Sequence, residues 1–367
     1  MSEGDPAERF MRRALALAER GRGLTSPNPM VGAVLVTSGG EIAGEGFHSR
    51  AGAPHAEVEA LRAAGARARG ATLYVTLEPC SHHGRTPPCA TAVIEAGVAR
   101  VVAAVADPNP LVSGRGFASL RAAGIEVVTG AGAAEAERQN RAFLTAMRER
   151  RPHVTLKAGM TLDGKIADLH GGSRWITGEA ARHRAHRLRA ESDAIVVGID
   201  TVLRDDPELT VRLGEPWPRE PLRVVLDTEA RIPAGARLIR AGRPSAAVIA
   251  VGAEALAATG ATVVCCRTRD KRVDLGALLA ELFAREVRAV LVEGGGEVHG
   301  GFLDSGLVDR VAMFAAPLLI GGRGATPVVG GAGRELKSAI RLGGFTVTPL
   351  GDDLLIEADV VRDSRGA

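Results

Sequence analysis

The segment from Pro54 to Cys89 reads PHAEVEALRAAGARARGATLYVTLEPCSHHGRTPPC, and the order of its elements decides the fold of this half of the chain. Its apolar spacing predicts a helix at 55–64, a strand at 71–76, a loop at 77–88 and a second helix at 89–96. Helices that alternate with strands are typical of a layered α/β domain. We therefore expect any chemistry of this segment to lie on such a scaffold.

The sequence on both sides of this segment continues the alternation. Upstream, helical spacing at 7–20 is followed by a buried strand at 31–36, a tight turn at Gly39-Gly40 and a returning strand at 41–47. Downstream, an apolar strand at 101–105 precedes a further helix and strand. A polar, basic stretch before Pro152 ends the pattern, so we expect one domain at 1–149 and another at 150–367.

The second half also alternates strands and helices, although it does not repeat the sequence of the first. Its apolar runs lie at 154–156, 194–197, 224–226, 246–251, 289–292 and 311–316. Helix-like stretches separate these runs, which predicts a second α/β domain. Cys265 and Cys266 end another apolar run, and we expect them to be buried strand residues without chemistry.

Composition narrows the class of protein. The 367 residues are 46% hydrophobic and 24% charged, and no apolar stretch has membrane-spanning length, so we expect no membrane span. Residues 1–13 contain no apolar signal core, so the expected compartment is the cytoplasm. A net charge of +3 suits small anionic substrates, and an aromatic content of 3% disfavours a single-stranded nucleic-acid binder.

A candidate metal site lies within the segment quoted first. His55, Cys80 and Cys89 provide one imidazole and two thiols, which zinc binds in tetrahedral geometry with a fourth position open to water. His55 and Glu57 are expected in the first turn of a helix, and Cys89 should open the next, where the helix end favours a thiolate. Glu57 is not needed as a ligand, so we expect it to pass a proton from water to a departing amine. The alternative is that both cysteines are buried structural thiols.

The spacing of the cysteines departs from the usual nucleobase deaminase pattern. That pattern combines H-x-E with P-C-x-x-C, whereas eight residues separate Cys80 from Cys89 here. The insert carries His82, His83 and Arg85 beside the metal ligands, where they could contact a substrate phosphate or ring. Together with the low aromatic content, this insert argues against RNA as the substrate.

The second half carries a weaker signal of ligand binding. The run from Val292 to Gly301, VEGGGEVHGG, follows an apolar strand and precedes a helix. Backbone amides of such a turn can hold a pyrophosphate at a helix N-terminus. The chain has 46 glycines and lacks G-x-G-x-x-G after its first strand, so a plain tight turn is an equal alternative.

Several motifs resemble the bifunctional deaminase-reductase family of riboflavin biosynthesis. In the first half they are TSPNPMVGA from Thr25, PHAEVEAL from Pro54, VTLEPCSHHGRTPPC from Val75 and DPNP from Asp107. In the second half they are KAGMTLDGK from Lys157, SRWIT from Ser173, DDPELTVR from Asp205 and VEGG from Val292. The resemblance implies a cytidine-deaminase-like α/β/α layered domain followed by a dihydrofolate-reductase-like α/β domain.

For the first domain, the resemblance implies zinc-dependent hydrolytic deamination of 2,5-diamino-6-(5-phosphoribosylamino)pyrimidin-4-one. His55, Cys80 and Cys89 would hold Zn2+, and Glu57 would be catalytic. The positions that match substrate contacts in the family are Asn28, His48, His82 and Arg85.

For the second domain, the resemblance implies NADPH-dependent reduction of 5-amino-6-(5-phosphoribosylamino)uracil, in which hydride reaches the first sugar carbon of a Schiff base. The implied cofactor positions are Gly159, Trp175, Thr201, Asp205, Thr228, Gly295, Gly296, Glu297, Val298, His299, Gly300 and Gly301. The implied substrate positions, of which the two arginines suit a phosphate, are Ser173, Arg189, Leu209, Arg212 and Glu293. Lys157 and Asp205 are expected to assist protonation, with a purely structural role as the alternative.

Two other functions are compatible with these residues. One is a deaminase of RNA or free nucleosides fused to an unrelated nucleotide-binding domain. The other is a non-catalytic sensor of zinc and dinucleotide, which Glu57 argues against because a structural metal site needs no free carboxylate. We expect phosphorylated pyrimidine substrates, no nucleic-acid or membrane partner, and a homo-oligomer, either a dimer or a tetramer.

Overall fold

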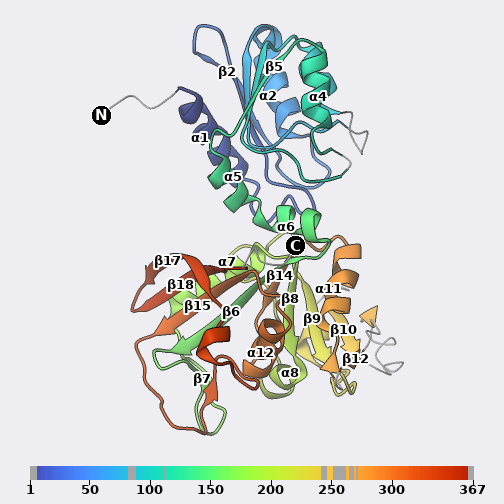
Figure 1. Cartoon of the computed structure of the whole chain (residues 1–367). Helices are drawn as coiled ribbons and strands as arrows, with labels where there is room; N and C mark the ends of the chain where they lie inside the picture. The colour runs from blue at the N-terminus through green and yellow to red at the C-terminus, as the bar shows by residue number, and fades with distance from the viewer. Residues whose placement is uncertain are drawn as a thin grey trace. The chain divides into compact units, whose positions relative to one another are not determined.

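A computed structural model describes residues 6–81, 88–110, 112–240, 246–250, 262–263, 268–269 and 272–362. Its contacts divide the chain into two compact units, of which the first ends at Arg151 and the second begins at Pro152 (Figure 1). The division lies close to the boundary expected between 149 and 150. Cys265 and Cys266 lie outside the described residues.

A five-stranded sheet forms the centre of the first unit, in the order β2-β1-β3-β4-β5. Its strands are β1 (Gly32–Val36), β2 (Ile42–Phe47), β3 (Thr72–Val75), β4 (Arg100–Ala103) and β5 (Glu126–Thr129). β1 runs antiparallel to both β2 and β3, whereas β3, β4 and β5 are parallel. Parallel neighbours require crossover connections, which here are helices.

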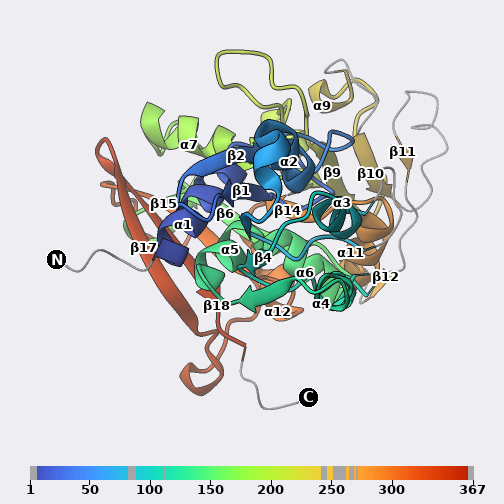
Figure 2. The same cartoon turned by 90° about the horizontal axis from the view of Figure 1, so that it is seen from above.

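Helices cover both faces of this sheet. They are α1 (Pro6–Glu19), α2 (Ala56–Ala64), α3 (Cys89–Glu95), α4 (Arg115–Ala122), α5 (Ala133–Gln139) and α6 (Arg141–Glu149). Because side chains alternate along a strand, Leu35 packs with residues of α2, α3 and α4, whereas Val34 and Val36 pack with α1 and α5. Figures 1 and 2 show α1 and α5 side by side. This is the predicted α/β/α layering.

Glycines bring α2 against β2 at backbone distance. A Cβ on Gly44 would lie 2.3 Å from the carbonyl oxygen of Ala60, and one on Gly46 would lie 2.3 Å from that of Ala56. Only glycine permits such a contact between the helix and strand backbones. The contact lies next to the start of α2. The prediction placed both His55 and Glu57 in the first turn of this helix, but only Glu57 lies there, and His55 is the N-cap residue with extended backbone.

A nine-stranded sheet forms the centre of the second unit, in the order β11-β10-β9-β8-β14-β6-β15-β18-β17. Its strands are β6 (His153–Thr161), β8 (Ala194–Gly198), β9 (Leu222–Asp227), β10 (Ala246–Ala250), β11 (Thr262–Val263), β14 (Ala289–Val292), β15 (Arg310–Ala316), β17 (Leu342–Leu350) and β18 (Asp353–Val360). The predicted apolar runs correspond to the consecutive parallel strands from β10 to β15 in this order.

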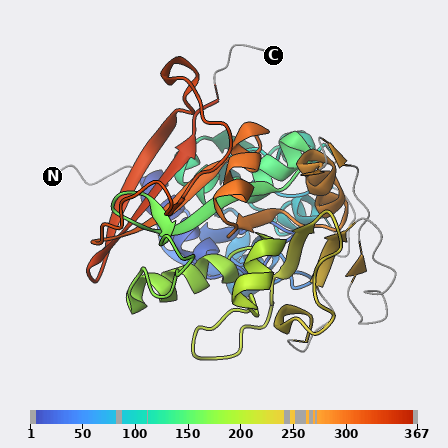
Figure 3. The same ribbon diagram turned by 90° about the horizontal axis from the view of Figure 1, so that it is seen from below.

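The edge formed by β17 and β18 is antiparallel and was not predicted from the sequence. Figure 3 shows this hairpin in red at one side of the sheet. β17 exposes most of its residues, so it carries no apolar run of the kind that reveals a buried strand.

Helices also cover both faces of the second sheet. α11 (Leu275–Ala284) and α12 (Gly296–Asp304) pack on one face, and α7 (Glu179–Ala190), α8 (Ile199–Asp205) and α9 (Arg237–Arg240) pack on the other. Two short antiparallel pairs, β7 (Lys165–Ala167) with β16 (Thr326–Pro327) and β12 (Thr268–Arg269) with β13 (Arg272–Val273), lie outside the sheet. Within the described residues, no helix is long and apolar enough to cross a membrane.

Candidate metal centre and cavity

The three predicted metal ligands come from separate elements of the first unit and converge. His55 caps α2, Cys80 lies in the loop after β3, and Cys89 is the first residue of α3. One ligand atom from each residue lies within 4.8 Å of the others. Nδ1 of His55 is 3.1 Å from Sγ of Cys89 and 3.6 Å from Sγ of Cys80. One imidazole nitrogen and two sulfurs at this spacing fit a tetrahedral zinc ion that keeps one position for water or substrate.

The protons of this cluster are tightly coupled. A hydrogen bond from Cys89 lowers the pKa of Cys80 to about 4, and the same shared proton raises the pKa of Cys89. The Glu57 carboxyl is buried, and this burial, followed by the charge of Cys80, raises its pKa to about 7. A dication bound here would remove the shared proton and lower the pKa of Glu57.

Asn28 and His48 were both predicted to meet substrate, and the His48 ring lies 5.4 Å from the ring of the metal ligand His55. Nδ1 of His48 is 3.1 Å from the Pro54 carbonyl oxygen, and Nε2 is 3.2 Å from Nδ2 of Asn28. Because a carbonyl only accepts, Nδ1 carries the proton and Nε2 accepts from the Asn28 amide. Burial lowers the pKa of His48, which favours this neutral form. His82 and Arg85, the other two predicted substrate residues, lie outside the described part of the chain.

Glu78 is an organising residue that the sequence reasoning missed. Its buried carboxylate accepts four backbone hydrogen bonds, from the N–H groups of Asp107, Gly114, Gly116 and Phe117 at 3.0–3.2 Å. It therefore ties the segment that carries Cys80 to the loop after β4. The sequence did carry a signal for this role, because Glu78 lies between apolar residues and two positions before the metal ligand Cys80.

Asp107 lies on the loop between β4 and α4, and its own backbone N–H is one of the amides that Glu78 binds. Its Oδ1 accepts a hydrogen bond from the backbone N–H of Asn109 at 2.8 Å. Burial, with the nearby charges of Glu78 and Cys80, raises the pKa of Asp107 to about 6. The loop thus places a third buried carboxyl, after Glu57 and Glu78, near the metal cluster.

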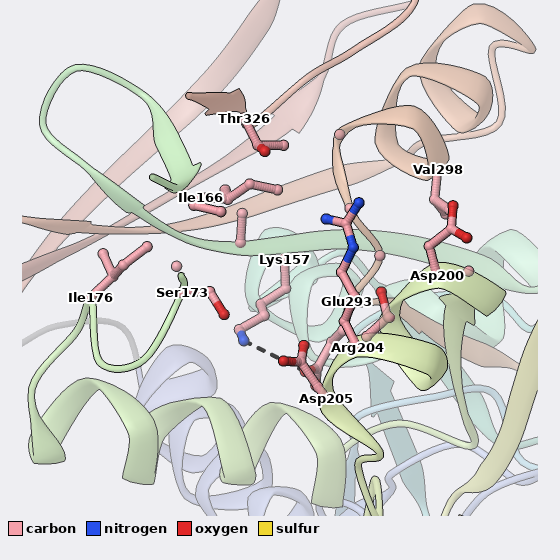
Figure 4. Close-up of a pocket in the computed structure, with 18 of the residues that line it drawn as sticks. Lys157, Ile166, Ser173, Ile176, Asp200, Arg204, Asp205, Glu293, Val298 and Thr326 are labelled. Atoms are coloured by element: carbon pink, nitrogen blue, oxygen red, sulfur yellow. Dashed lines mark ion pairs between the residues drawn. The ribbon is translucent and has the colours of Figure 1, made fainter. Parts of the chain in front are cut away.

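A cavity of about 530 Å³ opens in the second unit, between the end of β6, α7, α8 and the turn before α12. Most of the predicted residues line it, namely Lys157, Gly159, Ser173, Trp175, Arg189, Thr201, Asp205, Arg212, Glu293, Gly295, Gly296, Glu297 and Val298. Figure 4 shows Lys157, Ser173 and Asp205 around the same space. Leu209 lines an adjoining cavity that shares Trp175 and Asp205 with the first.

Four predicted cofactor positions do not belong to the wall of this cavity: Thr228, His299, Gly300 and Gly301. His299 is fully buried, and its Nδ1 donates to the Val328 carbonyl oxygen at 2.8 Å. A Cβ on Gly300 would lie 2.6 Å from the Gly330 carbonyl oxygen. Gly300 therefore serves backbone packing in α12, and the buried His299 ring joins this helix to the segment that contains Val328.

Of the three consecutive glycines in the turn before α12, one has open space where a pyrophosphate could approach the backbone. A Cβ on Gly294 would lie 2.5 Å from Cβ of Val298, and one on Gly296 would lie 2.5 Å from the Pro327 carbonyl oxygen. A Cβ on Gly295 would meet nothing within 4 Å. Gly295 therefore presents bare backbone to the cavity at the N-terminus of α12, where amide groups favour an anion.

Glu293 lies at the centre of an ion-pair network in the cavity wall. Its carboxylate makes a bidentate contact with Arg189 at 2.7 and 2.9 Å and lies 3.5 Å from Nζ of Lys157. Burial alone would raise the pKa of Glu293, but the charges of Arg189 and Lys157 hold it well below its usual range. Glu293 is therefore ionised at neutral pH and orients the Lys157 ammonium.

The two predicted phosphate-binding arginines differ in availability. Arg189 is largely occupied, because Nη1 also donates to the Thr210 carbonyl oxygen at 3.0 Å. The side chain of Arg212 is 58% exposed, lies 3.8 Å from Glu208 and donates a long hydrogen bond of 3.4 Å to Oγ1 of Thr210. Arg212 is thus the better placed of the two to meet a phosphate, and Arg189 positions Glu293.

Asp205 and Trp175 form the rim on the α8 side. Asp205 lies 3.9 Å from Arg174, and its backbone carbonyl accepts a hydrogen bond from the same guanidinium at 3.0 Å. The Trp175 ring is 70% exposed, with the Arg182 guanidinium stacked 4.6 Å from its centroid. An exposed ring on a cavity rim offers a flat apolar surface to a ligand.

Comparisons with known proteins support both units. Residues 5–105 match the cytidine and deoxycytidylate deaminase zinc-binding region, and residues 152–355 match the RibD C-terminal domain. The riboflavin biosynthesis protein RibD of Actinobacillus pleuropneumoniae is 43% identical, over 96% of this chain and 95% of the relative. This chain belongs to the RibD family. RibD of Escherichia coli strain K12 is 46% identical, over 86% of this chain and 88% of its own length.

Solved RibD structures share the whole architecture. Acinetobacter baumannii RibD has a TM-score of 0.90 with 39% identity, over 97% of this chain and 99% of its own. A diaminohydroxyphosphoribosylaminopyrimidine deaminase/5-amino-6-(5-phosphoribosylamino)uracil reductase from Thermotoga maritima has a TM-score of 0.87 with 38% identity, over the same shares. The predicted family, with a zinc-binding deaminase region and a RibD C-terminal domain, is confirmed.

Proposed function

We propose that this RibD protein carries out two successive reactions on a phosphoribosylated pyrimidine. The first is hydrolytic deamination of 2,5-diamino-6-(5-phosphoribosylamino)pyrimidin-4-one, and the second is NADPH-dependent reduction of the resulting 5-amino-6-(5-phosphoribosylamino)uracil. The observation that carries the proposal is the buried Glu57 beside a three-ligand metal cluster. The other unit of the chain adds a cavity lined by a glycine turn and a charged network.

In the deaminase half, His55, Cys80 and Cys89 hold zinc, which supplies Lewis-acid activation of water when bound. Glu57 accepts a proton from the attacking water and delivers it to the amine, which leaves as ammonia while a carbonyl forms. Asn28, held by its hydrogen bond to His48, is available to orient the pyrimidine. Burial excludes bulk water from Glu57 and keeps its proton for the substrate.

In the reductase half, NADPH supplies a hydride when bound along the turn that contains Gly295. The ribosylamine ring opens to a C=N bond, the hydride adds to the sugar carbon, and the nitrogen gains a proton. Lys157 is our candidate donor of that proton, because its ammonium is held by Glu293 while Glu293 itself stays ionised. Asp205, on the same wall, is the second candidate for assisting protonation.

The test is mass spectrometry of the purified protein incubated with the diaminopyrimidine phosphate. We expect one mass change without NADPH, from amine to carbonyl, and a second change of two hydrogens when NADPH is added. A zinc-loaded protein that produced neither change would contradict the proposal. A protein that bound zinc and dinucleotide without turnover would instead be the non-catalytic sensor considered above.

We also propose that the protein works as a homo-oligomer in the cytoplasm. Phe345 and Val347 are exposed on β17, which is the edge strand of its sheet, and Leu319 is a further exposed apolar residue. Apolar side chains on an unpaired edge favour pairing with a second copy. A reducing compartment keeps Cys80 and Cys89 available as metal ligands. Light scattering in solution tests the oligomeric state.

A further inference from the structure

His186 is a cavity residue that neither the motifs nor the resemblance singled out. It lies on α7, three residues before Arg189, and lines the same cavity as Lys157 and Glu293. Nδ1 of His186 lies 3.2 Å from the backbone nitrogen of Arg212, whose N–H donates to it. Because Nδ1 accepts, the proton of the neutral ring is on Nε2. The ring therefore offers one N–H donor to the cavity.

The charged groups that act on this ring form an anion-binding environment. They are the three cations Arg189, Arg212 and Lys157 and the single carboxylate Glu293. Burial and then the charges of Arg189 and Arg212 lower the pKa of His186 to about 4, so the ring is neutral at physiological pH. Glu293 and Glu220 offset the charge of Arg189, whereas Glu208 lies no closer than 3.8 Å to Arg212. Arg212 is therefore the cation best able to pair with a phosphate.

The occupied and free hydrogen-bonding groups near His186 sharpen this picture. Arg189 is used by Glu293 and Thr210, as described above. Nε2 of His186 has no hydrogen-bond partner among the described residues, and the Arg212 side chain is mostly exposed. Nε2–H of His186 and the guanidinium of Arg212 are thus both available to a ligand, and the hydrogen bond from the Arg212 N–H to Nδ1 of His186 keeps the two residues together.

We propose that Nε2–H of His186 donates a hydrogen bond to the phosphate of the reductase substrate, beside Arg212, and so selects the phosphorylated substrate over its dephosphorylated form. This role rests on the reductase activity proposed above. A hydrogen bond to a charged oxygen is among the stronger ones, so its loss should weaken substrate binding by about tenfold or more.

Two isosteric substitutions separate contact with substrate from positioning of the Arg212 loop. In His186→Asn the amide oxygen replaces Nδ1 as acceptor for the Arg212 N–H, but the Nε2–H donor is lost. In His186→Gln the amide group reaches the place of Nε2 and restores a donor. His183→Asn is the matched control, because His183 is exposed on the same helix and is not part of the cavity wall.

Reduction is measured with the deaminated phosphoribosyl substrate and with the same compound after phosphatase treatment. For His186→Asn we expect KM for the phosphorylated substrate to rise about tenfold, with an unchanged KM for the dephosphorylated one and for NADPH. His186→Gln should recover most of this loss, and His183→Asn should behave as wild type.

Other outcomes overturn the assignment in distinguishable ways. If His186→Asn is normal and His186→Gln is impaired, His186 only positions the Arg212 loop. If the KM for NADPH rises instead, the ring meets a phosphate of the cofactor. If wild-type protein fails to oxidise NADPH with either compound, the reductase function itself is wrong. Equal losses on both sugar substrates would exclude a phosphate contact.

Discussion

The metal centre and the cavity differ in the length of sequence over which their residues are spread. His55 and Cys89 are 34 residues apart, and the whole ligand set lies within one helix-strand-helix segment. The cavity of the second unit joins residues from Lys157 to Gly330. A site built from one segment can be recognised by spacing and ligand chemistry alone. A site built from many strand ends needs the sheet order before its members can be grouped.

The two sites also tune their central carboxylates in opposite directions. Glu57 has a pKa raised to about 7 by burial, whereas the pKa of Glu293 is held well below its usual range by Arg189 and Lys157. A zinc ion bound beside Glu57 would lower its pKa again and leave the carboxylate ready to accept a proton from water, whereas Glu293 is kept ionised by protein cations alone. On the proposed function, the same residue type transfers a proton in one half and holds a lysine ammonium in place in the other.

The largest effect is expected from Glu57→Gln, which removes the proton carrier and keeps the shape of the side chain. We expect ammonia release to fall by about 10³-fold, because general acid-base catalysis contributes on that scale. Zinc content, measured by metal analysis, and reduction of pre-deaminated substrate should be unchanged. Glu59→Gln, on the exposed side of the same helix, is the control. Full ammonia release by Glu57→Gln would remove the proton-transfer role.

The second expected effect concerns acid stability of the RibD C-terminal unit. Burial lowers the pKa of His299 from 6.5 to about 4 in the folded state. Since the folded state disfavours the charged ring, the stabilising contribution is complete above pH 6.5 and is lost as pH falls toward 4. The loss amounts to about 3 kcal/mol of unfolding free energy on the linkage relation.

His299→Asn tests this contribution, because the Asn amide can still donate to Val328 but does not titrate. We expect denaturant unfolding of the variant to show a shallower decline between pH 6.5 and 4 than the wild type. Identical slopes would mean that His299 does not control acid stability.

A third prediction tests the charge network of the cavity. Lys157→Met should reduce kcat for NADPH oxidation by about 10²-fold, because it removes the proposed proton donor and leaves Glu293 without one of its cations. Deamination should be unaffected, and this result would show that the two sites work independently. Lys337→Met, at an exposed surface position, is the control. A variant with normal kcat would shift the proton-donor role to Asp205.

The smallest effect is expected from Glu78→Gln. Each carboxylate oxygen of Glu78 accepts two backbone hydrogen bonds. In glutamine, an NH2 group that cannot accept replaces one of these oxygens, so two N–H groups lose their partner. We expect the first unit to lose about 2 kcal/mol of unfolding free energy and to release zinc more readily to a chelator. Exposed Glu95→Gln is the control. Unchanged stability and zinc retention would show that the Cys80 loop does not depend on Glu78.

Much of the fold could be predicted because apolar runs report burial directly. Each predicted run of the second half is a strand in the parallel part of the nine-stranded sheet, since such strands are buried on both faces. The β17–β18 hairpin escaped prediction because its exposed strand carries no such run. For the metal centre, the ligand types and spacing predicted the cluster of His55, Cys80 and Cys89 that the structure brings together, and they placed Glu57 beside it.

Other site residues could not be found from the sequence for a physical reason. Glu78 and His186 act through hydrogen bonds to backbone N–H groups of distant segments, and backbone partners leave no pattern in the sequence. The separate duties of Arg189 and Arg212 likewise depend on which of them Glu293 engages in three dimensions. Family resemblance located both arginines but did not distinguish them.

The close packing of α12 has an evolutionary consequence. At Gly296 and Gly300 any larger residue would collide with the backbone near Pro327 and Gly330, whereas Gly295 has open space on the cavity side. Selection should therefore preserve the first two glycines for the sake of chain packing, even in a descendant that has lost its cofactor. Variation at position 295, by contrast, would record a change of ligand. In this segment, we expect the positions that vary least to be those that report least on what is bound.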